Sequence, residues 1–199
     1  MCLKMGNFLK KGTFDIKILS VIFSVLLAVI DRITKALAVA FIKPAGSIPL
    51  IKFGDTEVLN FTYCENTGMS FSMLEGQRVI LILLPVLLIG LVEWYIFSGK
   101  PTRKDMIIAL AALAGGGLGN LIDRVLNGAV VDFIDFKLIN FAIFNFADIC
   151  AVCGGLWFGI AMLIEEIKSD KEKKLAEAQQ QDTKQEPAAQ AEEPENGQN

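Results

Sequence analysis

The chain has 199 residues, 53% of them hydrophobic, and its mean hydropathy is +0.48. This composition is too apolar for an ordinary water-soluble domain of this length and indicates a membrane protein. The formal net charge is −3, and the acidic excess falls in the C-terminal tail, so we expect no basic surface for nucleic acid. Histidine is absent, which excludes histidine-based catalytic triads and histidine-ligated metal sites.

Four apolar segments are each long enough to cross a bilayer, which takes about 20 helical residues. The chain is therefore predicted to be an all-α membrane protein with four transmembrane helices, at residues 18–42, 79–97, 106–125 and 143–164. Residues 168–199 are rich in Glu, Gln, Ala and Lys and show no apolar periodicity, so we expect a disordered cytoplasmic tail. The membrane domain is then residues 1–167.

The basic residues predict the orientation of these helices. Lys and Arg gather before the first segment, between the second and third, and after the fourth. Because such flanks stay on the cytoplasmic side, both termini are expected to face the cytoplasm. Of the two outward connections, residues 43–76 contain a β-prone stretch and predict a small extracytoplasmic sheet. The shorter connection, residues 126–142, is expected to dip into the membrane interface.

Polar side chains interrupt the apolar segments, at a cost of about 3 kcal/mol for each charge at mid-bilayer. The predicted orientation brings nearly all of them to the outer side of the membrane. Asp31 and Lys35 lie four residues apart on one helix and can pair. Asp123 and Arg124 are adjacent, so they point in different directions and each needs its own partner, with Arg32 as one candidate for Asp123.

Two carboxylates are harder to explain as links between helices. Asp132 and Asp148 are each flanked by apolar residues, in the stretches VVDFI and FNFADI. Two carboxyl groups held close together share one proton, so that one can activate water while the other protonates a carbonyl. In a chain without histidine, this pair is the simplest route to peptide hydrolysis that the composition permits.

Structural and transport alternatives stay open at this point. Gly115 and Gly119 have the spacing that lets helix backbones approach closely, and Cys150 and Cys153 are expected to be two small buried residues rather than a redox pair. Intramembrane charges also occur in transporters and in proton-conducting proteins, and polar helix contacts also occur in non-enzymatic assembly subunits. The clustering of charges at one depth argues against an ion pathway.

Five motifs in order resemble the lipoprotein signal peptidase (signal peptidase II) family over residues 15–167. They are DRITK at 31–35, NTGMSF at 66–71, GGLGNLIDR at 116–124, VDF at 131–133 and FNFAD at 144–148. The resemblance implies four transmembrane helices with an extracytoplasmic β-cradle at about 43–76. It also implies a cofactor-free, metal-free aspartyl peptidase of the bacterial inner membrane that is inhibited by globomycin.

The resemblance further implies a substrate and roles for individual residues. The substrates would be prolipoproteins that carry a diacylglyceryl group on a cysteine, cut on the amino side of that cysteine, with membrane lipids as the surroundings. Asp132 and Asp148 would be the catalytic pair, and Asp123 is the less favoured alternative to Asp132. The substrate-contacting and supporting residues would be Asn66, Gly68, Asn120, Arg124 and Asn145. Asp31, Lys35 and Asp123 would form the polar scaffold beneath them.

Overall fold

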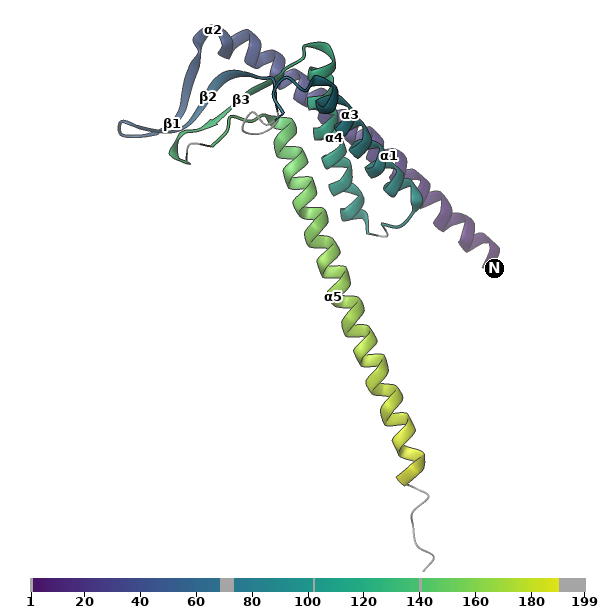
Figure 1. Cartoon of the computed structure of the whole chain (residues 1–199). Coiled ribbons are helices and arrows are strands. Elements are labelled where there is room, and N and C mark those ends of the chain that lie inside the picture. The colour runs from purple at the N-terminus through teal and green to yellow at the C-terminus, as the bar shows by residue number, and fades with distance from the viewer. Residues whose placement is uncertain (1, 69–73, 102, 140, 190–199) are drawn as a thin grey trace, which may run out of the picture. The chain divides into compact units, whose positions relative to one another are not determined.

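The computed structural model describes residues 2–68, 74–101, 103–139 and 141–189. It divides into two compact units, Met1–Phe158 and Gly159–Asn199. The first unit begins with helix α1 (Cys2–Leu37), which continues through a π-helical turn, η1 (Ala38–Ile42), into the short helix α2 (Lys43–Ala45) (Figure 1). Gly46 then adopts a φ of 74°, which glycine tolerates without strain, and turns the chain into the sheet.

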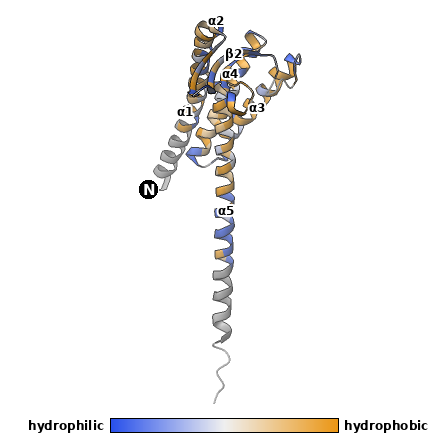
Figure 2. Ribbon diagram, turned by 90° about the vertical axis from the view of Figure 1, so that its left-hand side faces the viewer, coloured by the Kyte–Doolittle hydropathy of each residue, from blue (hydrophilic) through white to orange (hydrophobic). Residues whose placement is uncertain are grey.

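Three helices among the described residues are long and apolar enough to cross a membrane. They are α3 (Arg78–Ser98), α4 (Lys104–Leu126) and the part of α5 (Phe146–Ala189) that runs to Glu177. Figure 2 shows hydrophobic residues along α3, α4 and the first part of α5, and mostly hydrophilic residues further along α5. Helix α1 carries Asp31, Arg32 and Lys35 close together near its C-terminal end, so a fourth membrane crossing stays a prediction.

A three-stranded antiparallel sheet follows the end of α1, with strand order β1-β2-β3. Strands β1 (Ser47–Phe53) and β2 (Thr56–Asn66) form a hairpin inside the segment predicted to contain a sheet. The third strand, β3 (Val130–Phe136), comes from the shorter connection, for which no strand was predicted. That this connection dips into the membrane interface stays a prediction. Its Val, Phe and Ile residues favour strand conformation once β2 offers a free edge to pair with.

The sheet packs one apolar face on the end of the first helix. Ala38 and Ile42 of η1 form a buried cluster with Val131 and Phe133 of β3, and Phe61 of β2 packs against it. The ring centroids of Phe61 and Phe133 are 5.9 Å apart in an edge-to-face contact. This cluster fixes β3, and with it Asp132, relative to α1.

Small residues let the helices of the first unit approach closely. Gly115 of α4 lies against the backbone of Ser24 in α1, and the Ser24 hydroxyl donates to the Ala111 carbonyl oxygen at 2.8 Å. Gly119, four residues on, lies against Asp31 of α1 and Ala147 of α5. The predicted packing role of Gly115 and Gly119 is confirmed, and their contacts bring the polar residues of three helices together.

The second unit, Gly159–Asn199, contains the continuation of α5 up to Ala189. This helix runs well past residue 168, where we expected the disordered tail to begin. The segment is rich in Glu, Lys, Ala and Gln, which are strong helix formers even without tertiary packing. The division of the chain into a membrane domain and a separate tail stays a prediction.

Candidate active site

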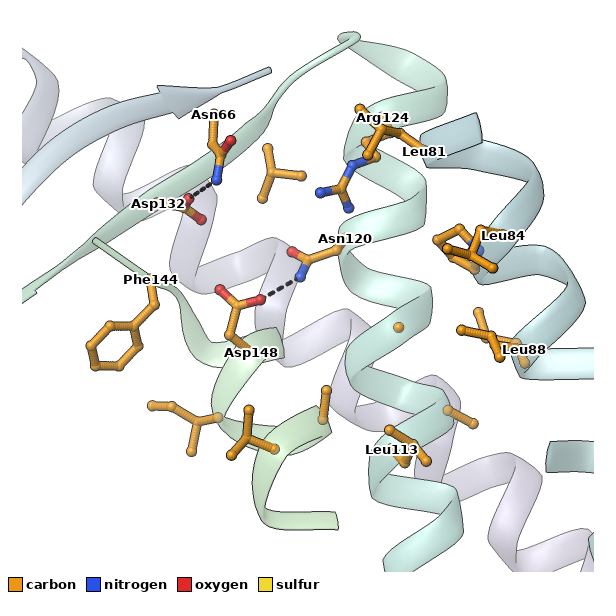
Figure 3. Close-up of a pocket in the computed structure, with 18 of the residues that line it drawn as sticks. Asn66, Leu81, Leu84, Leu88, Leu113, Asn120, Arg124, Asp132, Phe144 and Asp148 are labelled. Carbon is orange, nitrogen blue, oxygen red and sulfur yellow. Dashed lines mark hydrogen bonds between the residues drawn. The ribbon is translucent and has the colours of Figure 1, made fainter. Parts of the chain in front are cut away.

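A largely apolar cavity of about 630 Å³ lies within the first unit. Apolar residues of α3, α4, the segment just before α5 and the first turns of α5 form most of its wall. Five polar side chains enter it from β2, α4, β3 and α5, as Figure 3 shows: Asn66, Asn120, Arg124, Asp132 and Asp148. An apolar cavity with a few converging polar groups is the usual form of a ligand site.

Asp132 stands on β3 with only 3% of its surface exposed. Its two carboxylate oxygens accept hydrogen bonds from the side-chain amides of Asn66 at 3.0 Å and Asn145 at 2.6 Å. Burial raises the pKa of Asp132 to about 6; the two amide donors lower it, and the nearby charge of Asp148 raises it. Asp132 therefore holds a proton to much higher pH than an ordinary aspartate.

Asp148 lies in the first turn of α5, and its position follows from a local sequence rule. The Asn145 side-chain oxygen accepts from the Asp148 N–H at 3.0 Å, while the Asp148 carboxylate accepts from the Asn145 N–H at 3.0 Å. This reciprocal exchange is a capping box, in which a cap residue and the third helical residue satisfy each other's N–H groups. The Asn-x-x-Asp spacing thus begins α5 and orients the Asp148 carboxylate.

Asn145 connects the two carboxylates. It is fully buried, and it contacts Asp132 through its side-chain amide and Asp148 through its backbone N–H. Asn120 of α4 adds a donor to the other Asp148 oxygen at 2.8 Å (Figure 3). The pair therefore receives four N–H donors, two on each carboxyl group, and both groups reach the same cavity.

A buried ion network lies beside the pair. The Lys35 ammonium contacts Asp31 at 2.7 Å and Asp123 at 2.9 Å, which confirms the predicted pairing of Asp31 with Lys35. Arg32 also pairs with Asp123, so the candidate partner considered from the sequence is the observed one. The N–H of Ala147 donates to Asp31 at 3.0 Å, which ties the network to the start of α5.

Arg124 and Asn66 hold the loop that follows β2. One Arg124 nitrogen donates to the Gly68 carbonyl oxygen at 2.8 Å, and the Gly68 N–H donates to the Asn66 side-chain oxygen at 2.9 Å. The rest of this motif, residues 69–71, lies outside the described residues. Gly68 itself does not line the cavity, whereas Asn66 and Arg124 do.

All ten predicted site residues form contacts in or directly beside this cavity, and five of them line it: Asn66, Asn120, Arg124, Asp132 and Asp148. Asp123 does not line it and contacts Lys35 beneath it. Cys64, which pairs with Asp132 across the sheet, was not predicted to lie at the site. This position could not be predicted because the third strand was not expected. Cys64, Cys150 and Cys153 are free thiols. Among the described residues, no three acidic or cysteine side chains converge as a metal site would require.

Comparison with known proteins identifies the family of this chain. The family described as "Signal peptidase (SPase) II" matches residues 23–164, which is more than half of the chain. The chain belongs to the signal peptidase II family. Membership makes it a peptidase, and the cavity that holds Asp132 and Asp148 is its candidate active site.

Similar proteins support the family assignment over most of their own length. The chain is 40% identical over 136 residues to a lipoprotein signal peptidase of Caldanaerobacter subterraneus subsp. tengcongensis, covering 68% of this chain and 90% of that protein. It is 35% identical over 152 residues to one from Clostridium novyi, covering 75% and 98%. A bacterial membrane enzyme solved by the in meso method at 2.3 Å superposes with a TM-score of 0.66 and 30% identity, covering 74% and 88%.

Proposed function

We propose that this chain is an intramembrane aspartyl endopeptidase that removes signal peptides from diacylglyceryl-modified prolipoproteins, cutting on the amino side of the lipidated cysteine. Family membership supports the substrate class. The observation that carries the mechanism is the pair of carboxyl groups on one cavity, bridged by Asn145. No histidine exists in the chain to serve as an alternative base.

In the proposed mechanism, Asp132 and Asp148 share one proton. One carboxylate removes a proton from water, which attacks the scissile carbonyl carbon, while the other donates its proton to the carbonyl oxygen. We assign the shared proton to Asp132, whose pKa burial raises to about 6, and the role of the base to Asp148. The amide donors of Asn66, Asn120 and Asn145 hold the two carboxyl groups in place.

Charge balance supports a single shared proton. The network contributes two negative charges, from Asp31 and Asp123, and two positive charges, from the buried Lys35 and from Arg32, which is partly exposed. Arg124 adds one further positive charge beside the cavity, so the whole cluster is neutral when the aspartate pair carries one negative charge. Neutrality is favoured because uncompensated charge in a low-dielectric interior is costly.

We further propose that the protein lies in the bacterial inner membrane with both termini in the cytoplasm and the aspartate pair near the outer leaflet. The basic residues in three of the flanking segments support this orientation. At that depth, water can reach the pair, and a substrate anchored by its acyl chains can enter the apolar cavity from the bilayer. Arg124 and Asn66 line the cavity and are placed to bind the extended scissile segment.

The test is cleavage of a purified diacylglyceryl-modified prolipoprotein by the full chain in detergent, compared with the same precursor without its lipid. We expect a single cut before the lipidated cysteine, read by mass spectrometry, with the unlipidated precursor left intact. A well-folded sample that cuts neither precursor would contradict the proposal, and a liposome flux assay would then examine the transport alternative.

The shared proton also predicts the pH dependence of cleavage. We expect a bell-shaped profile of kcat/KM, because the reactive pair needs one carboxyl group ionised and one protonated. Activity falls at low pH when both groups are protonated. It also falls at high pH when the pair loses its second proton, and since the pKa of Asp132 is raised to about 6, this alkaline limb should lie at or above pH 6. A profile that stays flat from pH 4 to pH 9 would show that no such pair controls the reaction.

A further inference from the structure

The hydrogen bonds of the aspartate pair depend on which way three asparagine amides face. An asparagine side chain can present either its oxygen or its nitrogen to a neighbour, and only the nitrogen can stabilise an ionised carboxylate. A neighbour that can only donate therefore fixes the orientation, because it must meet the oxygen. Asn66 meets the Gly68 N–H in this way, and Asn145 meets the Asp148 N–H.

For Asn120, the donor that fixes the amide is a buried side chain. The Lys35 ammonium lies 2.9 Å from the Asn120 side-chain oxygen, and an ammonium group has three donors and no acceptor. The Asn145 amide donates to the same oxygen at 3.1 Å. The Asn120 nitrogen is then left facing Asp148, to which it donates at 2.8 Å.

The position of the Lys35 ammonium group is fixed by its surroundings. Lys35 is 2% exposed, and its ammonium nitrogen lies 2.7 Å from an Asp31 oxygen, 2.9 Å from an Asp123 oxygen and 2.9 Å from the Asn120 side-chain oxygen. The two carboxylates alone would suffice to balance Lys35 and Arg32, so the contact with Asn120 is additional to the ion network. Through Asn120, this contact links the ion network to Asp148.

We propose that Lys35 is a positioning residue for the catalytic pair: its ammonium group fixes the Asn120 amide with the oxygen toward α1 and the nitrogen toward Asp148. This inference rests on the assignment of Asp132 and Asp148 as the catalytic pair. Without Lys35, the Asn120 oxygen keeps only the 3.1 Å hydrogen bond from the Asn145 amide, so the Asn120 amide turns more readily and can present its oxygen to Asp148. An acceptor in that place favours the protonated carboxyl group and weakens Asp148 as the base.

Several charged groups surround this contact and must be kept balanced in any test. They are Asp31 and Arg32 on α1, Asp123 and Arg124 on α4, Asp132 on β3 and Asp148 on α5. Removing Lys35 alone would leave Asp31 and Asp123 with too little positive charge, and unpaired buried charges are strongly destabilising. The test therefore uses the double variant Lys35→Met with Asp31→Asn, which removes one charge of each sign.

The experiment is a double-mutant cycle that combines this charge-balanced variant with Asn120→Ala. The kcat and KM for cleavage of the lipidated prolipoprotein are measured for each protein. We expect the charge-balanced variant to lower kcat about 100-fold, with KM changed less than threefold and the pH profile of kcat moved to higher pH. If Lys35 acts through Asn120, adding its loss to Asn120→Ala changes kcat by less than threefold, because interacting residues are not additive. Thermal unfolding of each variant shows whether it is folded.

Three results would overturn the inference. The first is an unchanged kcat in the folded charge-balanced variant. The second is a triple variant whose loss equals the product of the separate losses, which means that Lys35 and Asn120 act independently. The third applies if the charge-balanced variant does not fold, in which case Lys35→Arg is measured instead, alone and together with Asn120→Ala. The inference fails if both of these proteins keep the kcat and the pH profile of the unmodified chain. If the unmodified chain does not cleave at all, the proposed function fails together with this inference.

Discussion

Replacing either aspartate of the pair by asparagine should abolish cleavage. We expect Asp132→Asn and Asp148→Asn each to lower kcat by roughly 10³-fold or more, because each variant removes a group that must carry or accept the transferred proton. Both substitutions keep the size of the side chain, and both side chains line the cavity, so the loss should appear in the chemistry and not in folding. The measurement is single-turnover cleavage of the lipidated prolipoprotein.

Asp123→Asn separates the catalytic pair from its scaffold. Asp123 is fully buried against Lys35 and Arg32 and does not line the cavity. Its loss should therefore lower thermal stability, since breaking a buried ion pair costs about 3–5 kcal/mol, while the protein that remains folded still cleaves. Asp55→Asn in the exposed β1–β2 turn is the matched control and should change neither property. Cleavage that survives Asp132→Asn but is lost in folded Asp123→Asn would move the catalytic role to Asp123.

Some parts of this site follow from short-range rules and could be predicted. The pairing of Asp31 with Lys35 follows from their spacing of four on a helix. Flanking charge and segment length predicted that the polar residues gather at one depth, and in the structure they lie in or beside one cavity. The capping box at Asn145 and Asp148 is equally local, although it becomes recognisable only once the start of α5 is known.

The parts that were missed depend on contacts between distant segments. The third strand, β3, is a short apolar run, and such a run fits a strand, a buried loop or an interfacial segment equally well. What decides is the free edge of β2, more than 60 residues earlier, where Asn66 pairs with Val130. The hydrogen bond from Asn66 to Asp132 depends on this pairing, so its geometry could not be foreseen without the strand.

The amide orientations were also beyond sequence reasoning. The motif around Asn120 indicates a polar side chain near the pair. The oxygen of that amide accepts hydrogen bonds and its nitrogen donates them, so the two ends are chemically opposite. The positions of Lys35, 85 residues earlier on α1, and of Asn145 show that the Asn120 oxygen accepts their hydrogen bonds and that its nitrogen faces Asp148. Close packing of α1 against α4 through Gly115 makes this contact possible.

Close packing also predicts a large effect of substituting Gly116 on α4. A methyl group added there would lie 2.7 Å from the backbone nitrogen of Ala151 and would overlap the carbonyl oxygen of Ala147. Both are backbone atoms of α5, on either side of Asp148, so they cannot turn aside as a flexible side chain could. Gly116→Ala must therefore push the start of α5 away from α4.

We expect Gly116→Ala to lower the melting temperature by about 4 °C or more, since overpacking costs about 1–3 kcal/mol and each kcal/mol corresponds to about 2–4 °C in a chain of this size. Cleavage should fall about 100-fold, because a shift of about 1 Å in a catalytic group has that effect. Gly155→Ala on α5 is the matched control: nothing lies within 4 Å of its added methyl group, and alanine favours helix over glycine. Gly155→Ala should therefore keep or slightly raise stability and leave cleavage unchanged. If both variants behaved alike, the contact between α4 and α5 would not be what holds Asp148 opposite Asp132.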